Sequence, residues 1–344
     1  MIILGIETSC DETSIAVIEN GTRVLSNVIF SQIKMHAKTG GVVPEVAARE
    51  HVVKIIPVFE EALKKANLSL EDIDAIAVTQ GPGLLSSLLT GAVTANTAAL
   101  FLNKPLIPVN HIHGHIYANW LEREESKFPI LILTVSGGHN EIFLMKGHGN
   151  IKTIGETVDD AAGEAFDKVA KLLGLPYPGG PAIMKAAVNG NPKAHRFPRA
   201  MMQPGNLDFS FSGIKTSVLY YLESERRKGK KISEQFVNDV AASFQEAVVD
   251  ALCSKLMRAV EKYKSIKEIH LAGGVSANTV LRKTIEEAVN LFNKKSGKNI
   301  IFKCPAKFEY CTDNAAMIAS AGYFNYIQNP RKFKNSYAEA SAEF

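Results

Sequence analysis

Short apolar runs separated by polar or glycine-rich turns recur along the chain, and this pattern predicts buried strands that alternate with helices. In the first half of the chain, the runs predict strands at residues 2–6, 14–19, 23–30 and 73–79. Asn20-Gly21 lies between the second and third strands and predicts a tight hairpin turn.

Two long helices are predicted in the same half. Residues 44–66 carry apolar side chains at helical spacing, and these form one stripe: Val46, Val53, Ile56, Phe59 and Leu63. Residues 84–102 are mostly apolar but contain serine, threonine and asparagine, which indicates a buried helix of a soluble protein rather than a membrane span.

The second half repeats this order of elements. Strands are predicted at 130–135, 141–146, 151–155, 268–272 and 299–302, and helices at 161–173, 233–263, 278–292 and 313–327. A repeated unit of this size predicts an α/β fold with two similar lobes and a central cleft. We expect the first lobe at 1–128, completed by the C-terminal segment 313–344, and the second at 129–312. This order resembles the actin, heat-shock chaperone and sugar-kinase (ASKHA) superfamily, in which a polar turn from each lobe grips nucleotide phosphates.

Composition places the chain among ordinary soluble proteins. Of its 344 residues, 46% are hydrophobic and 22% are charged. The four cysteines lack the spacing of a metal ribbon, and no signal peptide is visible, so we expect reduced thiols and a cytoplasmic location. A net charge of +4 permits contact with nucleic acid without demonstrating it.

A histidine pair is the first candidate for chemistry. The strand predicted at 106–109 is followed by a helix on which His111 and His115 lie four positions apart, on one face. Two stacked imidazoles can bind zinc or iron, although a pair of polar histidines at a helix start fits the spacing equally well. His113 points elsewhere. Zinc proteases share this spacing, but Ile112 stands where their general base would be glutamate.

Two polar turns are candidate anion sites. Ser136-Gly-Gly-His-Asn140 follows a buried strand, and its two glycines let exposed backbone N–H groups approach a phosphate; an ordinary hairpin is the alternative. The matching turn of the first half carries Glu7, Asp11 and Glu12. Asp11 or Glu12 could position a nucleophile or accept a proton, and a turn-forming or capping role is nearly as well supported.

Four further residues have both a structural and a ligand-binding interpretation. Asn278 follows Ala272-Gly-Gly-Val-Ser-Ala277 and is either a helix N-cap or a nucleoside contact. Asp167 could accept hydrogen bonds from ribose, and Gly180 could let the backbone approach a ligand. Asp313 is by default the N-cap of the last helix, but it could also complete a His, His, Asp metal site if that helix packs back onto the first lobe.

Three basic segments could contact RNA phosphates, although such segments are more often solvated surface. They are residues 192–199, 226–231 and 331–334.

Taken together, the ordered motifs resemble the TsaD family, formerly called Gcp or O-sialoglycoprotein endopeptidase, in its bacterial form. The motifs that carry the resemblance are Ile6-Glu-Thr-Ser-Cys-Asp-Glu-Thr13, Gly41-Val-Val-Pro-Glu45, Gln80-Gly-Pro-Gly83, His111-Ile-His-Gly-His115, Val135-Ser-Gly-Gly-His139, Asp208-Phe-Ser-Phe-Ser-Gly213, Gly273-Gly-Val-Ser-Ala-Asn278 and Cys311-Thr-Asp-Asn-Ala-Ala316.

The resemblance implies transfer of a threonylcarbamoyl group from threonylcarbamoyl-AMP to N6 of adenosine 37 in tRNAs that read codons beginning with A. It implies one divalent metal, iron first and zinc as the alternative, on His111, His115 and Asp313. The family's ligand contacts fall on Thr134, Val135, Ser136, Gly137, Gly138, Asp167, Gly180 and Asn278. For the general base we favour Asp11 or Glu12.

The resemblance also implies partners: tRNA, a TsaB-like paralogue and a TsaE-like ATPase, with no membrane and no DNA. Two rival functions remain, an ATPase of the same superfamily and a metalloprotease. The ATPase has no use for the paired histidines, and Ile112 argues against the protease.

Overall fold

The chain, seen here as a computed structural model, is described at every residue except 124, 230, 331–335 and 342–344. It divides into two compact units. Unit 1 comprises Met1–Ser126, Gly147–Asn150 and Pro305–Phe344, and unit 2 comprises Lys127–Lys146 and Ile151–Cys304. The lobe boundaries expected from the sequence stay a prediction: a first lobe at 1–128 with 313–344, and a second lobe at 129–312.

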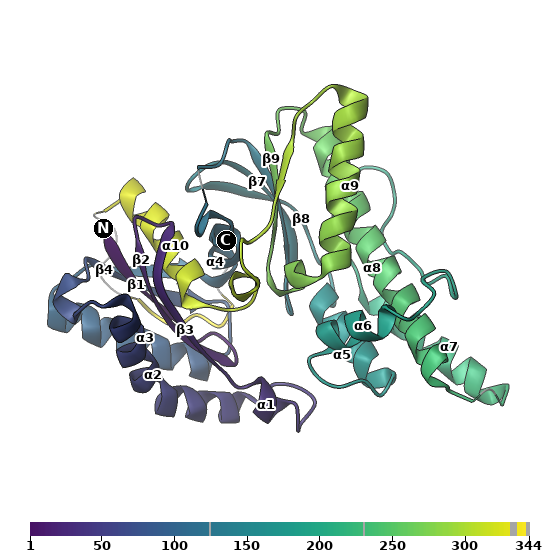
Figure 1. Ribbon diagram of the computed structural model, residues 1–344, viewed down its shortest axis with the longest axis horizontal. Helices are drawn as coiled ribbons and strands as arrows, with labels where there is room; N and C mark the ends of the chain where they lie inside the picture. Colours follow the sequence, from purple (N-terminus) through teal and green to yellow (C-terminus); the bar gives the residue numbers. More distant parts are fainter. Residues whose placement is uncertain (124, 230, 331–335, 342–344) are drawn as a thin grey trace. The chain divides into compact units, whose positions relative to one another are not determined.

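Five strands form the sheet of unit 1 in the order β3-β2-β1-β4-β5 (Figure 1). Their bounds are β1 Ile2–Glu7, β2 Glu12–Glu19, β3 Arg23–Ser31, β4 Ala75–Gly81 and β5 Leu106–Asn110. The first three strands form an antiparallel meander, and β4 and β5 run parallel to β1 and to each other. Asn20 and Gly21 have φ angles of 52° and 75°, so the predicted hairpin turn is confirmed.

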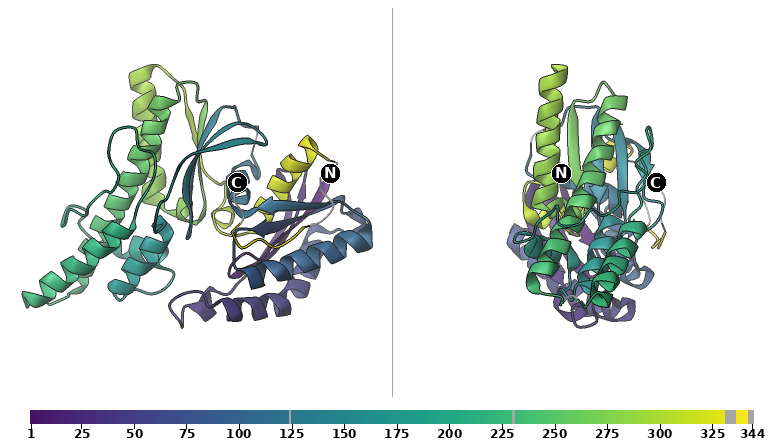
Figure 2. Two further views of the ribbon diagram at one scale, coloured as in Figure 1. Left: turned by 180° about the vertical axis from the view of Figure 1, so that it is seen from behind. Right: turned by 90° about the vertical axis from the view of Figure 1, so that its right-hand side faces the viewer.

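Helices cover both faces of this sheet. They are α1 Ile33–His36, α2 Pro44–Ala66, α3 Leu85–Leu102, α4 His111–Tyr117 and α10 Ala315–Gln328, with the short 3₁₀ turns η1 Leu70–Asp72, η2 Ala118–Trp120 and η4 Phe308–Tyr310. Helices α2 and α3 lie side by side on one face, and α10 lies on the other (Figures 1 and 2). A Cβ atom on Gly5 would lie only 2.2 Å from the Ala315 carbonyl oxygen, so this glycine allows α10 to approach β1 closely.

The predicted stripe of α2 is partly wrong. Val46, Val53 and Ile56 are exposed, Val53 to 60%. The buried side of α2 is instead formed by Ala47, His51, Ile55, Val58 and Ala62. The helix carries more than one apolar row, and helical periodicity does not tell which row faces the sheet.

The predicted burial of residues 84–102 is also wrong on one side. Helix α3 packs its small residues against β4 and α2, whereas Leu85, Leu89 and Val93 are exposed, Val93 to 62%. By length and composition alone, α3 is the one described helix that could cross a membrane, with a mean hydropathy of 1.4. One side of α3 packs against β4 and α2.

Unit 2 contains a second sheet with the strand order β10-β9-β6-β7-β8. The bounds are β6 Ile130–Val135, β7 Asn140–Gly147, β8 Asn150–Glu156, β9 Glu268–Ala272 and β10 Ile301–Lys303. Here too an antiparallel hairpin, β6 and β7, is continued by β9 and β10, which run parallel to β6 and to each other. The chain therefore traces the two sheets in the same order, which confirms the duplicated α/β fold.

The helices of unit 2 enclose one large apolar core. They are α5 Ala162–Leu172, α6 Gly179–Ala187, α7 Ser212–Arg227, α8 Glu234–Lys262 and α9 Thr279–Ser296, with a 3₁₀ turn η3 at Gly274–Ala277. Helices α6 and α7 were not predicted: α6 begins within a Pro/Gly segment that indicates a loop.

The sequence predicts the basic segment 226–231 as a loop before the long helix, and this is partly wrong because Arg226 and Arg227 form the last turn of α7. Residue 230 and the basic tail 331–334 lie outside the described residues.

Candidate metal centre and ligand-binding turns

Helix α4 positions the histidine pair. Asn110 ends β5, and its Oδ1 accepts hydrogen bonds from the backbone N–H groups of Ile112 at 2.8 Å and His113 at 3.3 Å. This cap starts the helix at His111, so His111 and His115 lie one turn apart on the same face. Their ring centroids are 4.7 Å apart.

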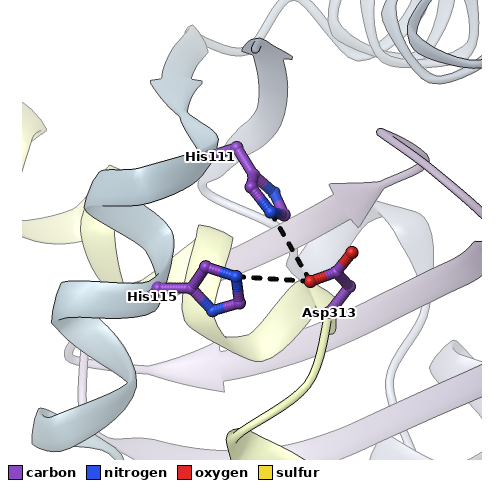
Figure 3. Close-up of side chains that lie close together, drawn as sticks. All are labelled: His111, His115 and Asp313. Atoms are coloured by element: carbon purple, nitrogen blue, oxygen red, sulfur yellow. Dashed lines mark ion pairs between the residues drawn. The ribbon is translucent and has the colours of Figure 1, made fainter. Parts of the chain in front are cut away.

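Asp313 joins the pair from the far end of the chain. The default prediction for Asp313, that it caps the last helix, is wrong: Asn314 caps α10 and accepts from the Met317 N–H at 3.1 Å. Asp313 Oδ1 lies 3.5 Å from His111 Nε2 and 3.3 Å from His115 Nε2 (Figure 3). The three ligand atoms all lie within 4.8 Å of one another.

The chemistry of His115 fits a metal ligand. The residue is 1% exposed; its Nε2 faces Asp313 Oδ1, and its Nδ1 has no hydrogen-bond partner among the described residues. A cation between Nε2 and the carboxylate would accept the lone pair of the nitrogen and balance the charge of Asp313. Two imidazoles and one carboxylate form a donor set that suits zinc or iron.

Glu7 contacts the ring nitrogen of His111 that faces away from Asp313. His111 Nδ1 lies 3.0 Å from Glu7 Oε2, which also accepts a hydrogen bond from Thr79 Oγ1 at 2.6 Å. The backbone N–H of Ser9 donates to the other carboxylate oxygen. Burial acts to raise the pKa of Glu7, but the charge of His111 and its hydrogen bond hold it below the ordinary value. A carboxylate on the second ring nitrogen orients a metal-binding histidine, and the sequence analysis missed this role.

Residues 10–13, the end of the loop after β1 and the first two residues of β2, form the Cys10–Thr13 turn, which carries Asp11 and Glu12. The Asp11 carbonyl accepts from the Gln32 N–H at 3.1 Å, and Glu12 Oε1 accepts from Ser31 Oγ at 2.9 Å. Burial raises the pKa of Glu12 well above its ordinary value, and the charges of Asp11 and Asp313 raise it further. The carboxyl group of Glu12 therefore binds a proton more readily than that of an ordinary glutamate, and the charge of Asp313 contributes to this.

In unit 2, hydrogen bonds between Ser136 and His139 close the glycine-rich turn after β6. The Ser136 N–H donates to the His139 carbonyl at 2.8 Å, and Ser136 Oγ accepts from the His139 N–H at 3.1 Å. Gly137 and Gly138 are exposed and face open space. A Cβ on Gly163 would lie 2.5 Å from the Ser136 carbonyl oxygen, so the first turn of α5 packs directly against this turn.

The strand before the turn contains the other two predicted contacts. Val135 is a core side chain of unit 2 and pairs with Asn140 of β7, so its contact with a ligand stays a prediction. Thr134 is buried, and its hydroxyl has no hydrogen-bond partner among the described residues.

The remaining predicted contacts have structural partners. Asp167 Oδ1 accepts from the Gly179 N–H at 2.6 Å, which brings Gly180 near it, and Gly180 faces open space. Asn278 caps α9, and its Nδ2 donates to Gln245 Oε1 at 2.9 Å. The N-cap role expected as one alternative for Asn278 is thus confirmed. Ligand contacts of Asp167, Gly180 and Asn278 stay predictions.

The matching family model and the relatives that are similar in sequence indicate one family. The family model described as TsaD, tRNA N6-adenosine threonylcarbamoyltransferase, matches residues 23–320. A tRNA N6-adenosine threonylcarbamoyltransferase of Desulfitobacterium hafniense (strain Y51) is 54% identical over 325 residues, which cover 94% of this chain and 92% of the relative. One from Kosmotoga olearia is 53% identical over 323 residues, with 94% and 93% covered.

A solved structure supports the fold alone. The (R)-2-hydroxyglutaryl-CoA dehydratase component A of Acidaminococcus fermentans aligns with a TM-score of 0.53 and 13% identity, covering 95% of this chain and 99% of that one.

Proposed function

The chain belongs to the TsaD family of tRNA N6-adenosine threonylcarbamoyltransferases, and we propose that it acts in the cytoplasm. Its product is the modified nucleoside N6-threonylcarbamoyladenosine, abbreviated t6A. The threonylcarbamoyl group would pass from threonylcarbamoyl-AMP to N6 of adenosine 37 in tRNAs that read codons beginning with A. The observation that carries the proposal is the cluster of His111, His115 and Asp313, which a kinase-like ATPase would not need.

The reaction replaces one bond to the carbamoyl carbon by another. N6 attacks this carbon, the new C–N bond forms, and the C–O bond to the phosphate breaks, so that AMP leaves with the bonding electrons. N6 also loses a proton. The adenine amine is a poor nucleophile because its lone pair is delocalised into the ring, and a positioned carboxylate would accept the proton. Asp11 and Glu12 are our candidates for this role.

We infer that the metal is a divalent ion, Fe²⁺ with Zn²⁺ as the alternative, on His111, His115 and Asp313. Bound there, it would supply Lewis-acid stabilisation of charge on donor oxygens. The contribution of Glu7 is to hold the His111 ring so that Nε2 faces Asp313.

The donor would bind unit 2 through its phosphate and adenosine. The exposed backbone of Gly137 and Gly138 is suited to an anion, because unobstructed N–H groups can donate to phosphate oxygens. Thr134 to Ser136 would extend this contact, and Asp167, Gly180 and Asn278 would contact the adenosine.

The substrate base lies in an anticodon loop, where it can be splayed out of the stack and reached by an enzyme. In the basic segment 192–199, Arg199 is already paired with Glu246 and Asp250. Lys193 and Arg196 are exposed, so we assign the phosphate contacts of this segment to them.

The protein partners would be a TsaB-like paralogue and a TsaE-like ATPase. We place the paralogue on the outward faces of α2 and α3, where Val53, Ile56, Leu89 and Val93 leave apolar surface exposed. Adjacent exposed apolar rows of this kind are typical of protein interfaces. Modification by this chain alone would then be weak or absent.

The test combines unmodified tRNA, intact threonylcarbamoyl-AMP and the purified protein, with and without both partners. Nucleosides from digested tRNA are read for t6A by mass spectrometry. The His111→Ala/His115→Ala variant runs in parallel, and its folding is checked by circular dichroism. We expect t6A from the native chain with partners and none from the variant.

Two other results would change the assignment. Equal modification by the variant would keep the reaction and remove the metal from its mechanism. A native chain that makes no t6A under any partner condition but hydrolyses ATP alone would favour the kinase-like ATPase.

A further inference from the structure

His51 lies on the buried face of α2, outside the motifs named above. Its side chain is fully buried within unit 1, and both ring nitrogens have partners. Nε2 lies 2.9 Å from the Cys10 carbonyl oxygen, and Nδ1 lies 2.8 Å from Thr13 Oγ1. One imidazole therefore contacts the first and the last residue of the turn that carries Asp11 and Glu12.

The two contacts determine the protonation of the ring. A carbonyl oxygen only accepts, so Nε2 carries the proton and donates to Cys10. Burial lowers the pKa of His51, which favours the neutral imidazole despite the backbone hydrogen bond and nearby carboxylates. The lone pair on Nδ1 then accepts a hydrogen bond from the Thr13 hydroxyl.

A second residue connects the middle of the turn to the same helix. The Gln32 N–H donates to the Asp11 carbonyl at 3.1 Å, and its Nε2 donates to the Ala47 carbonyl of α2 at 3.3 Å. His36 Nε2 lies 3.1 Å from Gln32 Oε1. Helix α2 thus holds the turn at Cys10 and Thr13 directly and at Asp11 through Gln32.

We propose that His51 is a positioning residue, which anchors the Cys10–Thr13 turn to α2 and so sets where the carboxylates of Asp11 and Glu12 lie. The proposal rests on the t6A function inferred above. A displacement of a catalytic group by about 1 Å can cost roughly 10²-fold in rate, so anchoring the turn matters more to the chemical step than to substrate affinity.

Two amide substitutions separate the two contacts. In His51→Gln, the longer side chain places its amide where Nε2 was, which retains the Cys10 contact and loses the Thr13 contact. In His51→Asn, the shorter side chain places its amide near the former Nδ1 and does the reverse. We expect each variant to lower kcat by about 10- to 100-fold, with KM for tRNA and donor and the bound metal unchanged.

A substitution of the hydroxyl partner sharpens the test. Thr13→Val removes the hydroxyl and nearly preserves side-chain volume, so it should lower kcat to the level of His51→Gln. Combining Thr13→Val with His51→Gln should cause no further loss, because both changes remove the same contact. Combining it with His51→Asn should lower kcat further, because the pair then loses both contacts.

Lys64→Gln, at an exposed position on the same helix, is the matched control and should retain native kcat. Native kcat in His51→Gln, His51→Asn and Thr13→Val would overturn the positioning role while the native chain still makes t6A. A native chain that makes no t6A with its partners would instead overturn the proposed function. If a His51 variant melts below the assay temperature, Thr13→Val decides: native kcat in this variant overturns the inference.

Discussion

At the scale of single residues, two neighbours near the C-terminus divide two tasks between them. Asn314 caps α10 and satisfies the Met317 N–H, so Asp313 is free to face His111 and His115. Aspartate and asparagine are both good N-cap residues. Because Asn314 follows Asp313, the amide caps the helix and the carboxylate reaches the histidines. The candidate centre therefore depends on a difference of one position.

Replacement of Glu7 by Gln tests the carboxylate behind His111. Glu7→Gln preserves the size of the side chain but removes the negative charge, so we expect metal affinity to fall by about 10- to 100-fold with little change in fold. Metal-depleted protein would be titrated with Zn²⁺ and with Fe²⁺, and the bound metal would be measured by mass spectrometry.

The control for this prediction is Glu19→Gln, a carboxylate at the end of β2 that pairs with Arg23 on the surface. Metal affinity of Glu7→Gln equal to that of the control would exclude an orienting role for Glu7.

A methyl group at Gly163 tests the anion-binding turn. In Gly163→Ala the new Cβ would collide with the Ser136 carbonyl oxygen and with Gly137 Cα, 2.8 Å away, so the turn must shift. We expect the dissociation constant for AMP or threonylcarbamoyl-AMP to rise by at least about tenfold, corresponding to about 1.4 kcal/mol.

Isothermal titration calorimetry measures this effect, with Gly147→Ala as the control because a Cβ there meets open space. Unchanged nucleotide binding in Gly163→Ala would argue that the Ser136–Gly138 turn does not bind the donor.

At the scale of elements, asparagine caps begin three of the helices near candidate site residues. Asn110 starts α4 just before His111, Asn278 starts α9 after the glycine-rich turn, and Asn314 starts α10 just after Asp313. A cap fixes the first helical residue, so it also fixes which neighbouring side chains face the site.

The outward faces of α2 and α3 are tested by charge. Val53→Asp combined with Leu89→Asp places two carboxylates on exposed apolar surface, so we expect unfolding free energy to change by only about 0.5 kcal/mol per substitution. Binding of the TsaB-like partner should be lost, because each carboxylate would have to be desolvated in the interface. Analytical ultracentrifugation and the t6A assay measure the two consequences.

Leu291→Asp on α9 is the matched control, because Leu291 is similarly exposed but belongs to unit 2. Partner binding that survives the double substitution would move the interface away from α2 and α3.

At the scale of the whole molecule, each unit combines a five-stranded sheet with its own apolar core, and unit 2 contains a buried charge network of its own. Glu268 is almost fully buried and accepts from His270 Nε2 at 2.8 Å, Lys303 Nζ at 2.9 Å and the Lys127 N–H at 2.9 Å. Burial acts to raise its pKa, but these hydrogen bonds and charges lower it to about 2.

This network predicts a pH dependence of stability. Because the folded pKa of Glu268 lies below its ordinary value of 4.5, its contribution is present above pH 4.5 and is lost as the pH falls toward 2. The unfolding free energy of Glu268→Gln should therefore differ most from that of the native chain near neutral pH. Urea unfolding at several pH values measures this; a gap that stays constant from pH 6 to pH 2.5 would contradict it.

Much of the fold and part of the site follow from the sequence by itself. Short apolar runs, the Asn20-Gly21 turn and the four-residue spacing of the histidines are local signals, so the strands, the hairpin and the placement of His111 and His115 on one helix face were predictable. The motif order was enough to indicate the family.

Only the tertiary structure decided which distant residues meet. Asp313 reaches the histidines because α10 packs closely on β1 at Gly5. Glu7 lies next to His111 because β1, β4 and β5 run parallel, so their carboxyl ends meet at one edge of the sheet. Local patterns likewise do not choose between two apolar rows on one helix, so the exposure of Val53 and the burial of His51 became visible only with the sheet in place. Packing against that sheet, and not periodicity, selects the face that each helix buries.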